Sequence, residues 1–363
     1  MQSFPTKSYN SESVHLVTAG DRRYLQGIQM TVASTLLKIP SNRHVVFHIL
    51  DGGLSEDNHR LLVSMASRLH QGCILDFHDI SDILPSDCNA GLGNWPLSSY
   101  ARIWMGTLIS GVDKVIYLDS DTFVLGDLSD LWDVNLQDFS TLACLDNKIA
   151  SLGDDTAGPL SDNEKDLPYI NGGLLVADLS IWREIQIERR AFEMINDPSC
   201  TYRWYDQTIL NYLLRGKVGV MSSEWNWIAR DFPIGGDLSV HLIHYTNSTK
   251  PWNYWGNEFR FQLWRECYRV VFGSPLWMFL SSGAWKGLCY GLFDSAIELV
   301  SPLRWIYLEY LKTIHSLSRD TMQKIVLDKK ISFLARKRSS ASKAEQKIFL
   351  KKFREELRAA VNN

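Results

Sequence analysis

Cysteine is scarce in this 363-residue chain and forms no metal-binding or disulfide pattern. Zinc ribbons need closely spaced cysteine pairs, and small disulfide-stabilised folds need a far higher cysteine density. The chain has no CxxC pair, and its six cysteines are scattered: Cys73, Cys88, Cys144, Cys200, Cys267 and Cys289. We therefore expect reduced thiols, which are typical of a cytoplasmic protein.

Long apolar runs are also missing. No stretch of about 20 apolar residues could span a bilayer, and residues 1–13 lack the apolar core of a signal peptide. The GxxxxGK loop that binds triphosphates is absent too, which disfavours a nucleotidyltransferase that cleaves a nucleoside triphosphate. These absences predict a cytoplasmic protein that could contact the inner face of a membrane only peripherally.

The composition is otherwise that of a folded protein, with 45% hydrophobic and 22% charged residues. The net charge is −3, but residues 323–363 contain twelve Lys and Arg against four Asp and Glu. A basic amphipathic tail of this kind suits anionic lipid head groups, although a solvated charged helix would look the same. Nucleic acid is not an expected partner, because the rest of the chain is acidic.

Strand and helix patterns alternate through the first third of the chain. The apolar runs predicted to be strands are residues 14–18, 45–50, 73–77 and 114–118. The segments between them predicted to be helices are residues 24–37, 55–70 and 98–109. This alternation indicates an α/β fold with a Rossmann-like, mostly parallel sheet flanked by helices.

Polar residues follow three of these predicted strands, at 18–21, 51 and 119–121. Ligands of such sheets bind beyond the carboxyl ends of the strands, so these residues should share one edge. Asp119 and Asp121 offer the hard oxygen ligands that Mg²⁺ or Mn²⁺ prefers while it also binds substrate phosphates. His244, at the end of a strand-like run over residues 240–244, could complete the site, and Lys250 could pair with phosphate.

Six motifs, in order, resemble glycosyltransferase family 8, which includes bacterial lipooligosaccharide galactosyltransferases and is similar to glycogenin. They are Thr18-Ala19-Gly20-Asp21, Tyr100-Ala101-Arg102, Asp119-Ser120-Asp121, Asn171-Gly172-Gly173, Asp206-Gln207 and His244 followed by Lys250-Pro251-Trp252. The resemblance covers roughly residues 14–255. It implies a GT-A fold, a UDP-sugar donor, Mn²⁺ and transfer with retention of anomeric configuration.

The resemblance also implies a role for individual residues. Asp119, Asp121 and His244 would bind the metal, which would be Mn²⁺ or Mg²⁺. Thr18, Ala19 and Asp21 would lie against uracil and ribose, Arg102 would approach the donor sugar and its phosphate, and Lys250 would hold the diphosphate. Asp146, Asn171 and Asp206 would bind sugar hydroxyls, and the other residues expected at the donor are Ser120, Gly172 and Asn247. Two departures from the family pattern affect this set: Arg22-Arg23 follows Asp21, and Asn247 replaces a glycine.

Retention needs either a double displacement or attack from the face that UDP leaves. Gln207, expected beneath the anomeric carbon, is an amide and a poor nucleophile, which favours same-face attack. Asp206 stays open as an alternative nucleophile, and a plain helix N-terminus is the alternative structural interpretation of this dipeptide. The glycines of Asn171-Gly172-Gly173 could admit the sugar closely or simply form a tight turn.

We therefore predict a retaining hexosyltransferase of cell-envelope polysaccharide biosynthesis, with glucose or galactose as the transferred sugar. The acceptor would be a glycan, a lipid-linked glycan or a protein, and Trp225 and Trp227 could lie on the acceptor side or in the core. The predicted domains are residues 1–255, a GT-A transferase domain, 256–322, an aromatic-rich helical region, and 323–363, the basic tail. The alternative is a non-catalytic protein that binds sugar nucleotides or glycans on the same fold.

Overall fold

The computed structural model describes residues 9, 12–83, 97–155, 158–197, 199–200, 203–229, 240–246, 248–253, 259–273 and 342–362. The chain forms two compact units. The first comprises residues 1–229 and 240–246, and the second comprises residues 230–239 and 247–363. The three-domain division made from the sequence stays a prediction.

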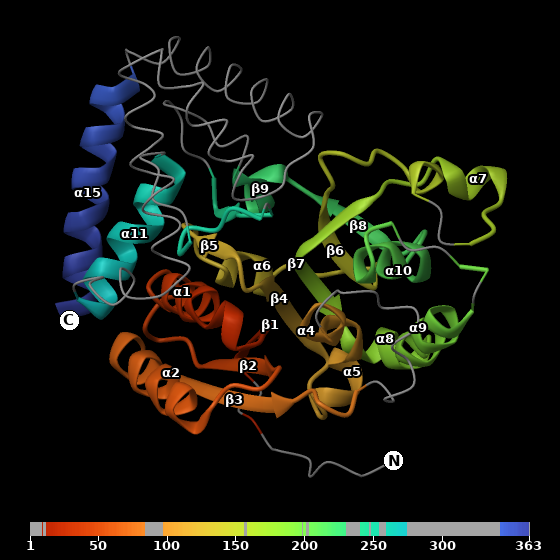
Figure 1. The fold of residues 1–363 in the computed structure, drawn as a ribbon, viewed down its shortest axis with the longest axis horizontal. Helices are drawn as coiled ribbons and strands as arrows, with labels where there is room; N and C mark the ends of the chain where they lie inside the picture. Colours follow the sequence, from red (N-terminus) through yellow and green to blue (C-terminus); the bar gives the residue numbers. More distant parts are fainter. Residues whose placement is uncertain are drawn as a thin grey trace, which may run out of the picture. The chain divides into compact units, whose positions relative to one another are not determined.

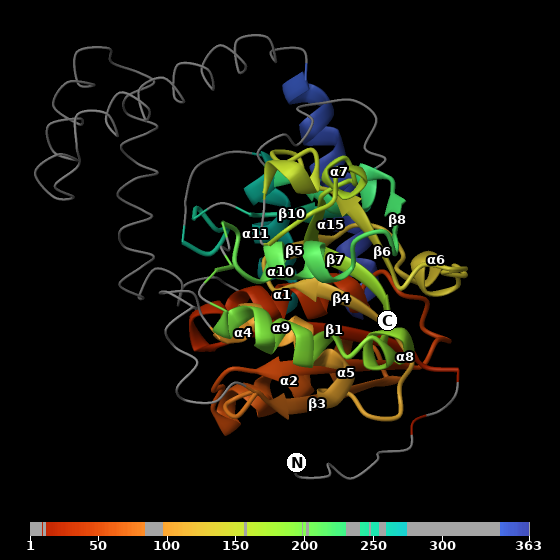
Figure 2. The ribbon, with the colours of Figure 1, turned by 90° about the vertical axis from the view of Figure 1, so that its right-hand side faces the viewer.

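The first unit contains a seven-stranded sheet with strand order β3-β2-β1-β4-β7-β6-β8 (Figure 1; Figure 2). Its strands are β1 (Val14–Gly20), β2 (Val45–Asp51), β3 (Cys73–Asp79), β4 (Lys114–Asp119), β6 (Thr141–Leu145), β7 (Ile170–Asp178) and β8 (Val218–Met221). The first four are parallel to one another, whereas β7 runs antiparallel to both β4 and β6. The mostly parallel sheet expected from the sequence is confirmed.

Helices cover both faces of this sheet, which explains why β1 and β2 are buried along their whole length. The helices of this unit are α1 (Leu25–Leu36), α2 (Glu56–Leu69), α4 (Leu97–Tyr100), α5 (Met105–Leu108), α6 (Ser129–Trp132), α7 (Asp162–Lys165), α8 (Leu179–Glu184), α9 (Ile187–Asn196) and α10 (Asp206–Leu213). Short 3-10 helices are η1 (Arg22–Tyr24), η2 (Ala101–Trp104), η3 (Leu152–Asp154) and η4 (Ser223–Asn226). Helices α1 and α2 lie on one side of the sheet, and α4, α5, α8, α9 and α10 lie on the other (Figure 1).

The predicted strand and helix positions agree with the structure to within a few residues. Ser55 caps α2 in a reciprocal capping box with Asn58, which explains why that helix begins where the polar pattern predicted. The single helix expected over residues 98–109 is instead broken into α4, η2 and α5. The predicted convergence at the sheet edge is confirmed, because Ala19 pairs with Asp119 and Gly20 pairs with Asp51 in the strand register.

A second, three-stranded sheet carries the distant histidine. It consists of β5 (Thr122–Val124), β9 (Trp227–Ile228) and β10 (Leu242–His244), in the order β5-β10-β9. Strand β10 is antiparallel to β5 and parallel to β9. Since β5 follows Asp121 directly, this pairing brings residue 244 back to the end of β4.

The described part of the second unit is built around α11 (Phe259–Phe272) and α15 (Ser342–Asn362). Phe353 and Leu357 of α15 are buried, and Arg354 donates to Glu266 of α11 at 2.7 Å. The helix predicted in the basic tail is therefore confirmed over residues 342–362, whereas residues 274–341, with most of the aromatic-rich region, lie outside the described residues. Within the described ranges, no helix combines the length and the apolar character needed to cross a membrane.

Candidate active site

Two carboxylates and one imidazole converge at the carboxyl end of β4. Asp119 is the last residue of β4, and Asp121 immediately precedes β5. His244 ends β10 opposite Thr122, and the Tyr245 amide donates to the Asp121 carbonyl at 2.9 Å. His244 Nε2 consequently lies 3.1 Å from Asp121 Oδ1 and 3.5 Å from Asp119 Oδ2.

Two buried threonine hydroxyls stabilise the turn that carries the two carboxylates. Thr122 Oγ1 donates to the Asp119 carbonyl at 2.8 Å, and Thr31 Oγ1 of α1 donates to the Thr122 carbonyl at 3.0 Å. The buried hydroxyl pair therefore satisfies main-chain groups that the end of β4 leaves unpaired. Both aspartates are partly exposed, so their carboxylates remain accessible.

Asn226 orients the His244 ring. Its Oδ1 lies 2.9 Å from His244 Nδ1, so that Nδ1 donates and Nε2 is left to face the carboxylates. Burial alone would lower the pKa of His244, but the charges of Asp121 and Asp119 outweigh it and raise the pKa to about 9. The ring is thus oriented so that Nε2 can bind a metal ion, and Nε2 carries a proton when no metal ion is bound.

The glycine pair makes room for side chains of the site. Gly172 and Gly173 lie in β7, so the tight-turn interpretation is wrong. A Cβ on Gly173 would lie 2.1 Å from His244 Cε1, and a Cβ on Gly172 would lie 2.8 Å from Arg102 Nη1. The glycines are required because the imidazole and the guanidinium pack directly against the backbone of β7.

Arg102 connects three parts of the site. Its Nη1 donates to Asp119 Oδ1 at 3.1 Å and to the Gly172 carbonyl at 2.6 Å, and its Nε donates to Asp206 Oδ2 at 2.5 Å. Burial would raise the pKa of Asp119, but Arg102 and His244 outweigh it and hold the pKa below its ordinary value. Asp119 is therefore a carboxylate that is ready to bind a cation.

Asp206 is only 2% exposed and lies at the start of α10, directly after Tyr205, whose φ of +52° is unusual for a residue other than glycine. Burial raises the pKa of Asp206 to about 6, with the charge of Arg102 opposing the shift. The carboxylate is enclosed and faces the guanidinium. The structure thus places Asp206 as a support for Arg102.

A polar network links the remaining predicted sugar-binding residues. Gln207 Oε1 accepts from the Gly172 amide at 3.0 Å, and Gln207 Nε2 donates to Asp146 Oδ2 at 3.3 Å. Asn171 Nδ2 donates to the same Asp146 oxygen at 3.0 Å. Four of the predicted residues, from β7, α10 and the loop after β6, are therefore brought together in the structure.

The residues predicted to bind the nucleotide at the end of β1 do not join this network. Thr18 and Ala19 are buried within β1, Ser120 is also buried, and Thr18 Oγ1 has no hydrogen-bond partner among the described residues. Asp21 caps η1 through the Arg23 amide at 2.8 Å and pairs with the Arg23 guanidinium at 2.6 Å. Arg23 of the basic dipeptide thus engages the Asp21 carboxylate, which was predicted to lie against uracil and ribose.

The predicted donor-binding residues Lys250 and Asn247 are not part of the first unit. Lys250 is buried and belongs to the second unit, and its amide donates to Asn253 Oδ1 at 2.7 Å. Asn247 lies outside the described residues. The roles of both residues stay predictions.

The geometry of the carboxylate–imidazole cluster suits a divalent cation. Octahedral ions with bonds of about 2.1 Å hold neighbouring ligand atoms about 3.0 Å apart, close to the 3.1 Å between His244 and Asp121. One ligand atom from each of the three residues lies within 4.8 Å of the others. Once His244 is neutral, three carboxylates, those of Asp119, Asp121 and Asp206, face the single guanidinium of Arg102, so a divalent cation would balance the charge of the site.

The sequence pattern missed Asn226 and Tyr117. Tyr117 Oη donates to Asp119 Oδ1 at 2.8 Å, and Asn226 Nδ2 donates to Asn171 Oδ1 at 2.9 Å. Asn226 lies between Trp225 and Trp227, which drew attention instead, and Trp225 stacks on His241 with ring centroids 4.2 Å apart. A polar residue two positions before the Asp of a buried strand was the signal available for Tyr117.

The Rossmann-like sheet and the cluster at its edge define an α/β enzyme of the GT-A type. The model of glycosyl transferase family 8 matches residues 15–256, and the chain belongs to this family of glycosyltransferases. It is 26% identical over 262 residues to a lipopolysaccharide 1,2-glucosyltransferase of Escherichia coli K12, covering 68% of this chain and 74% of that protein. It is also 25% identical over 248 residues to a lipopolysaccharide 1,3-galactosyltransferase of Salmonella typhimurium, covering 65% and 72%.

A solved structure of the galactosyltransferase LgtC, in complex with donor and acceptor sugar analogues, has the same architecture. It superposes with a TM-score of 0.53 at 27% identity, covering 66% of this chain and 89% of LgtC. An active-site mutant of LgtC gives a TM-score of 0.57 at 25% identity, covering 70% and 94%. The predicted family and the predicted GT-A fold are therefore confirmed.

Proposed function

We propose that this chain is a retaining hexosyltransferase that moves glucose or galactose from a UDP-sugar to a glycan acceptor of the cell envelope. One observation carries the proposal: Asp119, Asp121 and His244, from three strand ends, converge in a geometry suited to Mn²⁺ or Mg²⁺. The similarity to lipopolysaccharide glucosyl- and galactosyltransferases supports the choice of sugar and the class of acceptor. A lipid-linked glycan is the acceptor that we favour.

The difficult step is the departure of UDP from the anomeric carbon. A cation held by Asp119, Asp121 and His244 would neutralise charge on the diphosphate, and electrostatic stabilisation of this kind is commonly worth about 3–4 kcal/mol per preorganised group. The bond between the anomeric carbon and the β-phosphate oxygen breaks, with its electron pair going to that oxygen. The acceptor hydroxyl bonds to the carbon from the same face and passes its proton to the departing phosphate.

Same-face attack is supported by the environment of the two residues that could have acted as nucleophiles. Asp206 is enclosed and paired with Arg102, so we assign it a positioning role. Gln207 is fixed through both ends of its amide, by the Gly172 amide and by Asp146. In this proposal Gln207 lies beneath the anomeric carbon, while Asp146 and Asn171 bind sugar hydroxyls.

The test is UDP release from a panel of UDP-sugars, with and without Mn²⁺, by wild type and by Asp121→Ala. Hydrolysis of UDP-glucose or UDP-galactose should depend on Mn²⁺ and fall at least about a hundredfold in Asp121→Ala. Asp130→Ala, an exposed aspartate of α6, is the matched control and should behave as wild type. Full activity of Asp121→Ala would overturn the assigned site, and UDP binding without turnover in wild type would favour the non-catalytic alternative.

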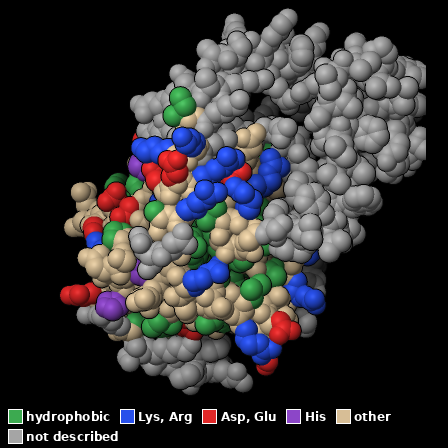
Figure 3. Space-filling view, turned by 90° about the vertical axis from the view of Figure 1, so that its left-hand side faces the viewer, with side chains coloured by type: hydrophobic (Ala, Val, Ile, Leu, Met, Phe, Trp, Pro, Cys, Tyr) green, Lys and Arg blue, Asp and Glu red, His purple; other side chains and the backbone are tan. Residues whose placement is uncertain are grey.

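The second unit supports peripheral contact with an anionic membrane, which would suit a lipid-linked acceptor. Lys and Arg side chains gather over α11 and α15 (Figure 3), and Lys351, Lys352 and Arg358 are exposed on α15. Ile348 of the same helix is 69% exposed. A hollow lined by Arg269, Val270, Arg358 and Val361 offers both charge and apolar surface to a lipid head group.

Sedimentation with phospholipid vesicles tests this contact. Vesicles containing phosphatidylglycerol should bind the wild type, and Lys351→Glu/Lys352→Glu should weaken binding by roughly tenfold or more, since each basic residue contributes about 1 kcal/mol. Arg60→Glu/Arg68→Glu, on α2 of the first unit, is the matched charge reversal and should bind as wild type. Equal binding of wild type to purely zwitterionic vesicles would contradict an electrostatic contact.

A further inference from the structure

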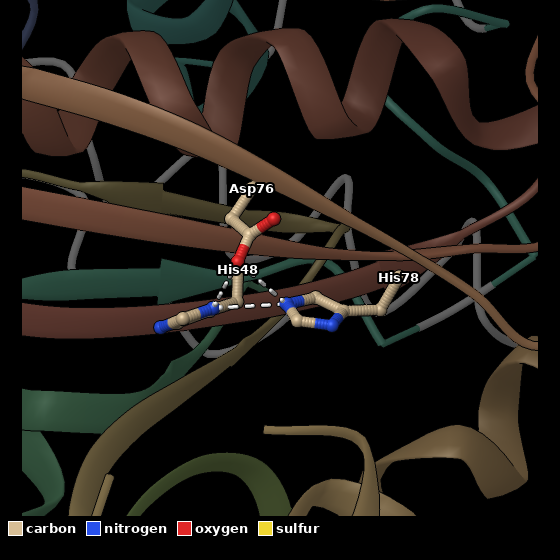
Figure 4. Close-up of side chains that lie close together, drawn as sticks. All are labelled: His48, Asp76 and His78. Carbon is tan, nitrogen blue, oxygen red and sulfur yellow. Dashed lines mark hydrogen bonds and ion pairs between the residues drawn. The ribbon is translucent and has the colours of Figure 1, made fainter. Parts of the chain in front are cut away.

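A second cluster of potential metal ligands lies on the same sheet, away from the end of β4. His48 is in the middle of β2, and Asp76 and His78 are in β3, which forms an edge of the sheet. His48 pairs with Asp76 in the strand register, and residues 76 and 78 point to the same face because side chains alternate along a strand. The three side chains point toward one another (Figure 4).

The distances in this cluster match a four-coordinate metal site. His48 Nδ1 lies 3.0 Å from His78 Nε2, and Asp76 Oδ2 lies 3.4 Å from His78 Nε2 and 3.8 Å from His48 Nδ1. A tetrahedral Zn²⁺ with bonds of about 2.0–2.1 Å separates its ligand atoms by about 3.3 Å. The three observed separations bracket this value, so one ion could contact all three atoms after shifts of a few tenths of an ångström.

A second layer of side chains supports these three. His48 Nε2 lies 3.0 Å from His15 Nδ1, and the Tyr9 hydroxyl donates to Asp76 Oδ2. The two nitrogens lie at hydrogen-bond distance, so His15 Nδ1 can accept the proton of His48 Nε2. With its proton on Nε2, His48 directs the lone pair of Nδ1 toward Asp76 and His78, as metal-binding histidines require.

Two of the three side chains, those of His48 and Asp76, are buried, and His78 is partly exposed. His48 has no exposed surface, and the residues that precede it in β2 are Val45, Val46 and Phe47. Two imidazoles and a carboxylate with this geometry favour Zn²⁺ and related transition-metal ions, whereas oxygen-rich sets favour Mg²⁺ or Mn²⁺. The set of ligands therefore differs in kind from the one at the end of β4.

We propose that His48, Asp76 and His78 form a structural binding site for Zn²⁺ or a chemically similar transition-metal ion, separate from the cation of the active site. A metal ion there would tie the edge strand β3 to β2. This inference does not depend on the donor or acceptor proposed above.

Equilibrium dialysis against Zn²⁺ tests the site in a full-length Asp121→Ala chain, in which the active-site cluster lacks one ligand. Bound metal is first removed with EDTA, and the EDTA is dialysed away. This chain should then bind about one Zn²⁺ per molecule. The additional substitution His78→Asn should reduce the amount of bound Zn²⁺ to less than about one tenth per molecule. The control substitution His44→Gln, which removes an exposed histidine, should leave that amount unchanged. Co²⁺ in place of Zn²⁺ should give the visible absorption of a four-coordinate ion only where His78 is present.

Thermal unfolding provides a second readout. Zn²⁺ at a hundredfold excess over its Kd should raise the Tm by roughly 5 °C in Asp121→Ala and in its His44→Gln derivative, but not in its His78→Asn derivative. Asp76→Asn, which is nearly isosteric, gives a second disruption if His78→Asn folds poorly by circular dichroism. Failure of the Asp121→Ala chain to retain Zn²⁺, or equal retention with and without His78, would overturn the proposal.

Discussion

The two clusters are built from the same side-chain types in opposite proportions. At the end of β4, two carboxylates face one imidazole, whereas the cluster of β2 and β3 has one carboxylate and two imidazoles. The first is assembled from the ends of β4 and β10 and the start of β5, with the aspartates partly exposed. The second is assembled from two adjacent strands. His48 and Asp76 lie in the middle of β2 and β3 and are buried, and His78 lies one residue before the end of β3.

In our proposals, this difference separates a cation that is shared with a substrate from an ion that would hold two strands together. The partly exposed carboxylates and the nearby Arg102 suit a cation shared with a substrate. Enclosure by His15 and Tyr9 suits an ion that stays bound. We assign the chemistry to the cluster at the end of β4, because ligands of such sheets bind beyond the carboxyl ends of the strands.

The largest expected effect concerns the glycine that makes room for His244. Gly173→Ala should reduce Mn²⁺-dependent UDP release by about a hundredfold to a thousandfold, because its Cβ would overlap the His244 ring. Gly172→Ala should cost less, since its Cβ meets the end of the Arg102 side chain. As a control, the amount of Zn²⁺ bound at the cluster of β2 and β3 should be unchanged in both variants. Equal rates of UDP release by the two variants would contradict the packing argument.

His244 and His15, the neighbour of His48, should change the stability of the metal-free chain in opposite directions as the pH changes. His244 has its pKa raised to about 9, so it contributes about 3 kcal/mol of stability below pH 6.5, which is lost as the pH rises through 9. His15 has its pKa lowered to about 4, so stability is lost as the pH falls from 6.5 toward 4. Urea unfolding in the presence of EDTA measures the free energy of unfolding at each pH. Its dependence on pH above 6.5 should vanish in His244→Gln, and its dependence below 6.5 should vanish in His15→Gln. The same pH dependence in both variants would contradict the prediction.

Removing the partner that orients His244 should have a moderate effect. Asn226→Ala should weaken Mn²⁺ binding by about 10–100-fold, since outer partners commonly contribute that much to metal affinity. Asn226→Asp keeps an acceptor for His244 Nδ1 and should recover most of the affinity. Calorimetric titration with Mn²⁺ checks this, and equal weakening in both variants would show that Asn226 acts by packing alone.

The smallest effect is expected at the outer partner of the other cluster. Tyr9→Phe removes one hydrogen bond to Asp76 and should weaken Zn²⁺ binding by roughly tenfold or less, with Mn²⁺ binding unaffected. Competition with a chromophoric chelator measures the change. An effect on Mn²⁺ binding as large as that on Zn²⁺ binding would mean that the two clusters are not independent.

Much of the fold was predictable because periodic apolar runs alternate regularly between residues 14 and 118. The motifs of Asp119, Asp121 and His244 could be recognised because chemistry demands particular residue types. Asn226 and the purpose of Gly173 could not, because each depends on His244, which lies more than 15 positions away in the sequence. Tyr117 was overlooked, although it stands only two positions before Asp119. His48, Asp76 and His78 also escaped notice, since a histidine within an apolar strand usually has a packing role.

The sequence by itself determined the α/β class, the family and the types of ligand at the end of β4, because local patterns and motif chemistry are written in consecutive residues. Only the tertiary structure decided which oxygens and nitrogens face one another. The pairing of β10 with β5 brings His244 to Asp121, and the pairing of β2 with β3 brings His48 to Asp76. Register between distant strands depends on the packing of the whole sheet, and for that reason a pattern of consecutive residues does not reveal it.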